Sequence, residues 1–395
     1  MKTLLALVLS VSFLFSFSGV KASSTEISNQ NEYITEEECM LAGNKWIRAN
    51  YSNRTCISDI IQVRNIDGTL SGYCINFELN GEPAGYLLLN AEKYCDEYIR
   101  EFSFDGEGIY ECLVQNAKSC AAKTVSRETE VIYVTNPYEY AIKVNVGADV
   151  LFYNSNNSFL PTELEMQEYI CHGRNAEAKN TQAESTRGDK QQYYNAFFYG
   201  GSLTNFTSNN DKCITGADSF TPFTMGNLCT GSNSNNCGPT AAMNMCGYYY
   251  SCGKTNIYTN SNVSDTYDAL VTAVGFPANG SGNTSYSNLK TGLRDYIQSR
   301  LYSVSVNGYL FNTWANFRTD FDANKPNLIF IEGYKYTNNT WITVGHFIIG
   351  IGYRIMNDGA RYVRVYDGWN ASSNRFIHFD SDTLITFNGA SVVVS

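Results

Sequence analysis

Positive charge and histidine are both scarce in this chain, which limits the functions open to it. The 28 lysines and arginines among 395 residues form no stripe or patch. Nucleic-acid binding depends on clustered positive charge, so that class of partner has no electrostatic support. Of the three histidines, His346 and His378 lie in the second half, and neither has a cysteine or carboxylate at zinc-ligand spacing. We therefore expect no metal and no cofactor.

Long apolar runs are also lacking, apart from a short one at the start. Residues 4–17 are mostly apolar, Lys2 precedes them, and Lys21-Ala22 follows with a small residue at the expected cleavage position. This pattern is typical of a secretory signal peptide over residues 1–22. The alternative is a membrane anchor, but the run is too short to span a bilayer comfortably and Lys21 interrupts it. No later segment reaches about 18 apolar residues, so we expect a secreted, extracellular protein with no membrane span.

The acidic excess lies in the first half of the chain. From Gln191 onward there are 12 basic and 12 acidic residues, and subtracting these from 28 and 38 leaves 16 and 26 in the first 190 residues. Between the halves, residues 173–192 have no aromatic or β-branched run, which favours a flexible, cleavable linker. We therefore predict one domain over 23–172, the linker over 173–192 and a second domain over 193–395.

Twelve cysteines in an exported chain predict disulfides. Seven precede residue 190, namely Cys39, Cys56, Cys74, Cys95, Cys112, Cys120 and Cys171. Five follow it, namely Cys213, Cys229, Cys237, Cys246 and Cys252. If disulfides stay within each half, parity leaves one free thiol in the second half. The alternative is that all twelve pair, with one bridge between the halves, and no single connectivity is favoured.

Strand and helix patterns predict an α+β fold for both halves. In the first half, Thr35 and Glu38 fit a capping box before a helix. Asp-Gly and Asn-Gly pairs at 67–68 and 80–81 then predict hairpin turns. Further strands are expected at 95–110, 131–134 and 141–146. In the second half, helices near 239–245 and 286–301 precede strands at 328–331, 346–353, 362–366 and 376–379.

Cys237 has the surroundings of a reactive thiol. It lies in the segment Asn-Cys-Gly-Pro-Thr-Ala-Ala, and Pro239 is typical of the first turn of a helix. The partial positive charge at a helix N-terminus favours thiolate over thiol, and the thiolate is the nucleophile. The alternative is a disulfide cysteine before an ordinary helix.

His346 is the candidate general base. Gly345 precedes it, which would allow a substrate or another backbone to approach closely, and an apolar strand follows it. A lone histidine on a strand is more often structural, but the pairing with a cysteine at a helix start favours catalysis. His378 lies in an alternating apolar strand and is interpreted as structural.

Asp367 lies where a carboxylate could orient that histidine. It follows His346 by 21 residues, at the expected end of the next strand, and could fix the imidazole tautomer. The alternative is an ordinary Asp-Gly turn. Asn370 is a second candidate for the orienting role.

The segments NCGPTAAMN, VGHFIIGIGY and YDGWN, in this order, resemble papain-like cysteine peptidases. The nearest groups are exported bacterial enzymes similar to the streptopain family and the bacteriocin-leader peptidases, and the match covers about 130 residues of the second half. The resemblance implies a helix carrying the nucleophile packed on an antiparallel sheet. It also implies a Cys237-His346-Asp367 triad, with Trp369 shielding the contact between the last two. The segment GYLLLNAEKYCDEYIREFSFDGEG resembles a streptopain-type propeptide and implies that the first half is an intramolecular inhibitor.

One position departs from the papain-like pattern. These enzymes usually carry a glutamine about six residues before the nucleophile to stabilise the oxyanion, and Gly231 stands there. Asn233, Asn235 and Asn236 are the side chains that could replace it, beside the backbone amide of Cys237.

Three functions remain open from the sequence. The first is a zymogen endopeptidase that acts on protein or peptide substrates as a monomer, through a thioester acyl-enzyme. The second is an amidase or transpeptidase that uses the same triad on cell-wall or other non-protein peptides. The third is a catalytically inactive secreted binding protein.

Overall fold

The structure is a computed structural model. It describes residues 32–52, 54–65, 68–121, 130–136, 138–146, 149–154, 159–160, 187–228, 236–277, 284–310, 312–337, 340–372, 374–379 and 386–395. The predicted signal peptide and residues 173–186 of the predicted linker lie outside these residues. In the described part of the chain, no helix is long and apolar enough to cross a membrane.

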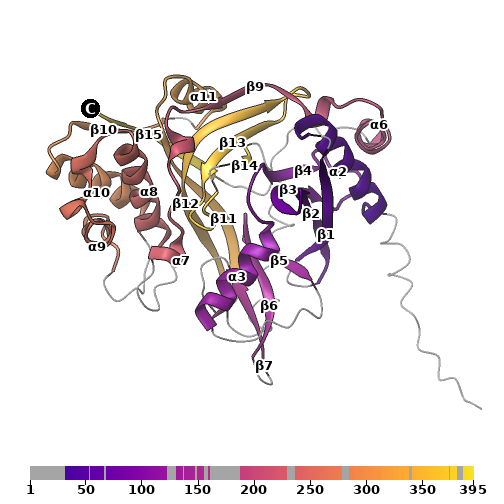
Figure 1. Ribbon diagram of the computed structural model, residues 1–395, viewed down its shortest axis with the longest axis horizontal. Coiled ribbons are helices and arrows are strands. Elements are labelled where there is room, and N and C mark those ends of the chain that lie inside the picture. Colours follow the sequence, from indigo (N-terminus) through magenta and orange to yellow (C-terminus); the bar gives the residue numbers. More distant parts are fainter. Residues whose placement is uncertain are drawn as a thin grey trace, which may run out of the picture.

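One mixed sheet runs through the molecule (Figure 1). It is 15-stranded over the described residues, with the order β10-β15-β11-β12-β13-β14-β4-β3-β2-β1-β5-β6-β7-β8, and β9 pairs with β12. Strands β1 and β5 are parallel, and the other described pairs are antiparallel. With helices packed beside the sheet, the predicted α+β class is confirmed.

The first half begins with helix α2 (Glu36–Asn50). Its predicted capping box is confirmed: the Thr35 hydroxyl accepts from the Glu38 amide, and the Glu38 carboxylate accepts from the Thr35 amide. The helix packs on strands β1 (Thr55–Asn65) and β2 (Leu70–Leu79), and β3 (Glu82–Asn90) continues this antiparallel sheet beside β2. The predicted turn at Asn80-Gly81 joins β2 to β3, with positive φ at both residues.

The rest of the first half adds more strands and a helix that the sequence analysis did not predict. A strand was expected at 95–110, and the structure has the shorter strand β4 (Ile99–Ser103) within that range. Helix α3 (Ile109–Ala121) begins at the end of the same range. The apolar residues of α3 recur at helical spacing and pack into a core with β6. The strands that follow are β5 (Val131–Asn136), β6 (Glu139–Val146), β7 (Asp149–Asn154) and β8 (Phe159–Leu160).

Helix α6 (Arg187–Phe198) begins inside the predicted linker and packs on the first half. Tyr194, Phe197 and Phe198 share a core with Trp46 of α2, and Lys45 donates a hydrogen bond of 2.6 Å to the carbonyl of Phe197. This core also takes in Phe206, Met356, Tyr362 and Phe376, so residues of both halves share it.

The second half places helices on the C-terminal strands. The helices are α7 (Met225–Leu228), α8 (Cys237–Ser251), α9 (Val263–Ala273), α10 (Tyr286–Ser299) and α11 (Trp314–Asp322). Short 3₁₀ turns cover Thr204–Phe206, Ala217–Ser219, Thr255–Ile257 and Thr259–Ser261. The strands are β9 (Ser208–Cys213), β10 (Val304–Gly308), β11 (Asn327–Thr337), β12 (Thr340–Met356), β13 (Arg361–Tyr366), β14 (Arg375–His378) and β15 (Thr386–Val394).

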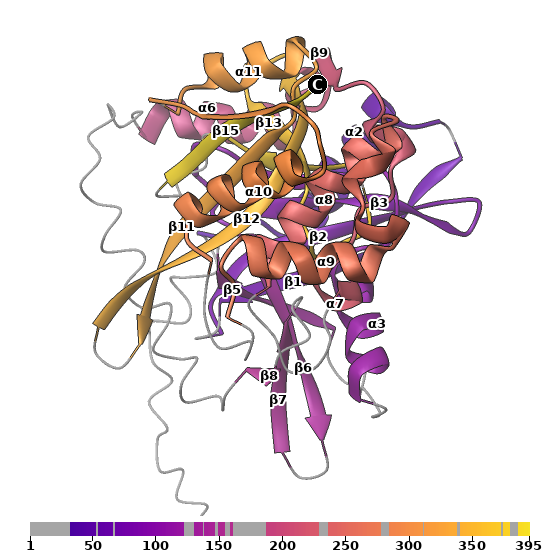
Figure 2. The same ribbon diagram turned by 90° about the vertical axis from the view of Figure 1, so that its left-hand side faces the viewer.

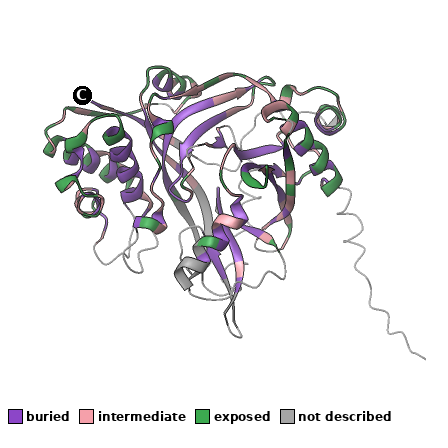
Figure 3. Ribbon diagram, in the orientation of Figure 1, coloured by how far each residue is buried: buried purple, intermediate pink, exposed green. Residues whose placement is uncertain are grey.

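Helix α8 is almost fully buried, and it packs directly on β12. Figure 2 shows α8, α9 and α10 gathered in front of β11 and β12. Figure 3 shows that α8, β13 and the part of β12 from His346 onward are mostly buried, whereas the outer faces of α9 and α10 are exposed. A nucleophile at the start of α8 is therefore held by the interior of the second half.

The two halves join edge to edge through β14 and β4. Phe376 pairs with Phe102, and Ile377 pairs with Glu101, in an antiparallel register. The sheet is therefore continuous from the second half into the first, and the joint lies one strand away from the turn that follows β13.

Disulfides were expected from the sequence. The nine cysteines whose side chains the structure describes are all free thiols, and none of them forms a disulfide. Cys39, Cys74 and Cys246 are fully buried and serve as small apolar side chains. Cys56 and Cys252 are exposed. The side chains of Cys120, Cys171 and Cys229 lie outside the described part.

Candidate active site

Cys237 begins helix α8, as the sequence predicted. The backbone amides of Phe347, Gly238 and Cys237 itself lie close enough to the sulfur to favour the thiolate and lower its pKa. Because Phe347 follows His346 directly on β12, this contact brings the thiol to the strand that carries the histidine. Burial nevertheless outweighs these amides and raises the pKa of the Cys237 thiol to about 11. The helix N-terminus alone does not produce a thiolate here.

His346 lies on β12 and is 9% exposed. Its Nε2 atom lies 2.6 Å from the main-chain oxygen of Asp367. The indole of Trp369 stacks on the imidazole, with ring centroids 4.0 Å apart and planes inclined by 15°. Since a carbonyl oxygen only accepts, Nε2 carries the proton, which leaves Nδ1 as the basic nitrogen.

Asp367 directly follows β13, as expected, but its carboxylate serves the turn itself. Oδ1 accepts from the amides of Trp369 (2.7 Å) and Asn370 (2.8 Å). Oδ2 pairs with the guanidinium of Arg375. From the sequence, this carboxylate was expected to orient the imidazole. In the structure, the main-chain oxygen of the same residue makes that contact.

The turn needs Gly368, whose φ is +76°, a value that side-chain-bearing residues rarely adopt. The carbonyl of Gly368 also accepts from the amide of Met225 at 2.6 Å, which ties the turn to α7. Trp369 is thereby held against the imidazole by the backbone on both sides of the turn.

The electrostatics of His346 keep it neutral. Burial is the main reason that its pKa falls to about 4, and the positive charge of Arg375 contributes in the same direction. The contact with Asp367 opposes this fall but does not offset it. A thiol with a pKa of about 11 beside an imidazole with a pKa of about 4 stays as an uncharged pair at neutral pH.

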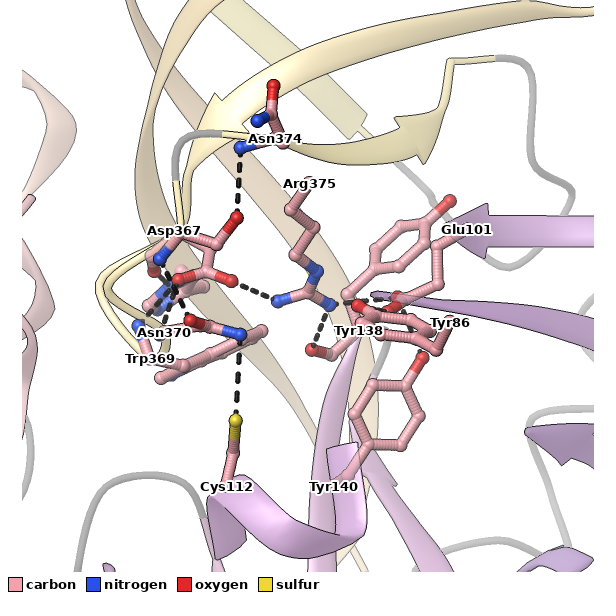
Figure 4. A network of polar contacts seen from close by, with 12 residues as sticks. Tyr86, Glu101, Cys112, Tyr138, Tyr140, Asp367, Trp369, Asn370, Asn374 and Arg375 are labelled. Carbon is pink, nitrogen blue, oxygen red and sulfur yellow. Dashed lines mark hydrogen bonds and ion pairs between the residues drawn. The ribbon is translucent and has the colours of Figure 1, made fainter. Parts of the chain in front are cut away.

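Arg375 links this turn to the first half (Figure 4). Its Nη1 binds Asp367, and its Nη2 donates to Glu101 on β4 at 2.8 Å and to the carbonyl of Tyr138 at 3.3 Å. The hydroxyls of Tyr86 and Tyr140 donate to the same Glu101 carboxylate, at 2.6 and 2.9 Å. Burial lowers the pKa of Arg375, but Glu101, Tyr86 and Asp367 raise it well above its usual range, so the side chain stays charged.

The turn between β5 and β6 reaches into the second half. Tyr138 is 2% exposed and packs in the core of the second half, and its hydroxyl donates to the carbonyl of His378 at 2.9 Å. The next residue, Glu139, is buried and lies near enough to Cys237 to raise the pKa of that thiol further.

The other predicted side chains have separate positions. Asn233 and Asn235, the oxyanion candidates, lie outside the described residues. Asn236 is buried and donates to the carbonyl of Met225 and the hydroxyl of Tyr267, so its amide serves the helix start. The imidazole of His378 pairs with the carboxylate of Glu97 at 2.7 Å, away from the site.

Gly345 was expected to let a substrate or another backbone approach closely. In the structure, a side chain of the same half of the chain lies against it. A Cβ atom at this position would lie 2.1 Å from a ring carbon of Phe330. That ring stacks on Phe347, with centroids 4.5 Å apart. The glycine before His346 therefore makes room for an aromatic stack beside the site.

Three residues of this site, Arg375, Glu101 and Glu139, were not predicted from the sequence. The sequence held a weak indication of Arg375 and Glu101, because each is a charged residue within a short apolar strand. Such a residue is buried when its strand is internal to the sheet. Their pairing across 274 residues left no local pattern. Among the described residues, no three histidine, cysteine or carboxylate side chains gather in a way that could hold a metal ion.

Comparison with known families gives a match over part of the chain. A family model described as Peptidase_C39 like family matches residues 220–383, which is less than half of the chain. The matched interval contains Cys237, His346 and Asp367, and it supports a relation to cysteine peptidases of the C39 type. A search of curated proteins found no match.

Proposed function

We propose that this chain is a secreted cysteine endopeptidase of papain-like type, synthesised as a latent precursor. The observation that carries the proposal is the joint placement of Cys237 and His346. The thiol begins a buried helix, the Phe347 amide next to the histidine lies near enough to the sulfur to lower its pKa, and Asp367 and Trp369 contact the imidazole. The family match over this interval supports the same chemistry.

In the proposed reaction, Nδ1 of His346 takes the thiol proton and the sulfur of Cys237 attacks the scissile carbonyl carbon. The Cys237 amide at the start of α8 is one donor for the developing oxyanion. The protonated imidazole then gives its proton to the leaving amine, and a thioester remains. Water, deprotonated by Nδ1, attacks the thioester and releases the acid and the thiol.

The precursor would be inactive because the pKa of the Cys237 thiol lies above that of the His346 imidazole. Transfer of the proton from sulfur to imidazole is unfavourable while the thiol has a pKa of about 11 and the imidazole one of about 4. Glu139 adds to this barrier, and it belongs to the first half of the chain. Displacing that half would remove one negative charge from beside the thiol, and this change favours the thiolate.

The test uses the chain from residue 23 beside a Cys237→Ala version, each followed over time for size, N-terminus and casein digestion, with and without an epoxide thiol inhibitor. We expect cleavage between residues 173 and 192, digestion of casein, and loss of both in the variant. If cleavage needs an added protease but casein is then digested, the endopeptidase stands and self-processing does not. Digestion of peptidoglycan fragments with casein left intact would instead favour the amidase or transpeptidase.

A further inference from the structure

We propose that Arg375 is a positioning residue of this site, which holds His346 through Asp367 and Trp369 and is itself held by the first half of the chain. Only the kinetic part of the test rests on the proposed peptidase function. Figure 4 shows the guanidinium lying between the Asp367 turn and Glu101.

Arg375 contacts both residues that fix the imidazole. Its Nη1 pairs with the carboxylate of Asp367, whose main-chain oxygen accepts from His346. Its guanidinium also lies 5.4 Å from the ring centroid of Trp369, which stacks on the imidazole. The Arg375 side chain thus contacts both Asp367, which accepts the Nε2 proton of His346, and Trp369, which stacks on the imidazole.

The first half determines where that guanidinium lies. Glu101 is fully buried, and its carboxylate accepts from Arg375, Tyr86 and Tyr140. The carbonyl of Tyr138 accepts from the same guanidinium. A buried charge is stable only while it is paired, so Arg375 and Glu101 fix each other, and in the precursor both halves hold the turn.

The contacts also have an electrostatic consequence. Arg375 carries its charge inside the core and helps to hold the pKa of His346 below its ordinary value. A residue that only stabilised the fold would not affect the ionisation or the tautomer of this one imidazole. Those two properties therefore distinguish positioning from general support.

The test is carried out on the full chain with Cys237→Ala, which keeps the precursor intact. The chain has only three histidines, so the imidazole signals of ¹³C- and ¹⁵N-histidine-labelled protein can be followed against pH, and the His346→Gln version identifies the signal of His346. In the parent chain we expect a single Nε2-protonated tautomer that titrates near pH 4.

Arg375→Met alone would leave Glu101 charged and without its cation, so the decisive variant is Arg375→Met with Glu101→Gln. The amide oxygen of the glutamine can accept from one of the two tyrosine hydroxyls, Tyr86 or Tyr140, and its NH2 group can donate to the other. We expect the pKa of His346 to rise by about one unit or more and the second tautomer to appear. The matched control is Arg364→Met, which removes another buried arginine, one that pairs with Asp218 on the neighbouring segment. We expect the pKa and the tautomer of His346 to be unchanged in the control. Arg375→Lys keeps a positive charge at this position, so the titration of His346 should stay closer to that of the parent chain than in the Met variant.

Casein digestion by the same variants in the Cys237 chain gives the second readout. A positioning role predicts that kcat falls at least about tenfold with little change in KM. If His346 titrates identically in the double variant and the parent, the positioning role is overturned, whatever the effect on digestion. If no chain digests casein but the His346 signals shift as expected, the peptidase function fails and the positioning role stands.

Discussion

The buried, neutral state of His346 makes the stability of the fold depend on pH in a calculable way. In the Cys237→Ala chain, His346→Gln replaces the imidazole by an amide that does not titrate. The pKa of the imidazole is about 4 in the folded protein, against 6.5 for the ordinary side chain. At about 1.4 kcal/mol for each pH unit, this difference corresponds to about 3.5 kcal/mol in full, of which about 3 kcal/mol is reached at pH 4.

The sign follows from which state binds the proton. Above pH 6.5 the imidazole is neutral in both states, so it adds no pH dependence. Between pH 6.5 and about 4 the unfolded chain takes up a proton that the folded chain refuses, so the free energy of unfolding decreases as the pH falls. Below about pH 4 the loss is complete.

Urea unfolding of the parent chain and of its His346→Gln variant, at pH 7.5 and at pH 4, measures this contribution. All other titrating groups are common to the two proteins and cancel in the comparison. We expect the stability advantage of the histidine version to be about 3 kcal/mol smaller at pH 4 than at pH 7.5. An advantage that is equal at the two pH values would refute the assignment of a buried, neutral imidazole.

Three further predictions concern other parts of the fold. Burial raises the pKa of Glu111 to about 7, and one of its carboxylate oxygens has no hydrogen-bond partner among the described residues. Because the charged carboxylate is the form that burial disfavours, Glu111→Gln should raise Tm more at pH 8 than at pH 4.5. An equal rise in Tm at both pH values would contradict the burial argument. Thr35→Ala removes the capping hydroxyl of α2 and should cost about 1 kcal/mol in urea unfolding, whereas Thr35→Ser should retain most of it. Gly345→Ala places a methyl group against Phe330 and should lower stability by about 1–3 kcal/mol; a Tm equal to that of the parent would show that the ring moves freely.

Local sequence signals predicted the parts of the site that depend on neighbouring residues. The proline after Cys237 indicated the start of α8, and the interval from His346 to Asp367 matched one strand, a turn and the next strand. The capping box at Thr35 and Glu38 was also a local pattern, and it is present.

The rest depends on contacts between distant segments, which have no period or spacing to read. The pairing of β14 with β4 and the bond from Arg375 to Glu101 are of this kind. The choice between the carboxylate and the carbonyl of Asp367 is another, because Arg375 and two backbone amides claim the carboxylate. The pKa of Cys237 was also misjudged from sequence, since the helix start predicts a lower value and burial raises it.

The central claim is that Cys237, activated by His346, is the nucleophile. The most direct test is to add an epoxide thiol inhibitor during casein digestion and locate the adduct by peptide mass spectrometry. The exposed thiols Cys56 and Cys252 are internal controls for unassisted reactivity. The account predicts an adduct at Cys237 that accumulates in step with the loss of digestion, no adduct at the two controls, and neither effect in His346→Ala. Undiminished digestion with Cys237 fully modified would contradict it.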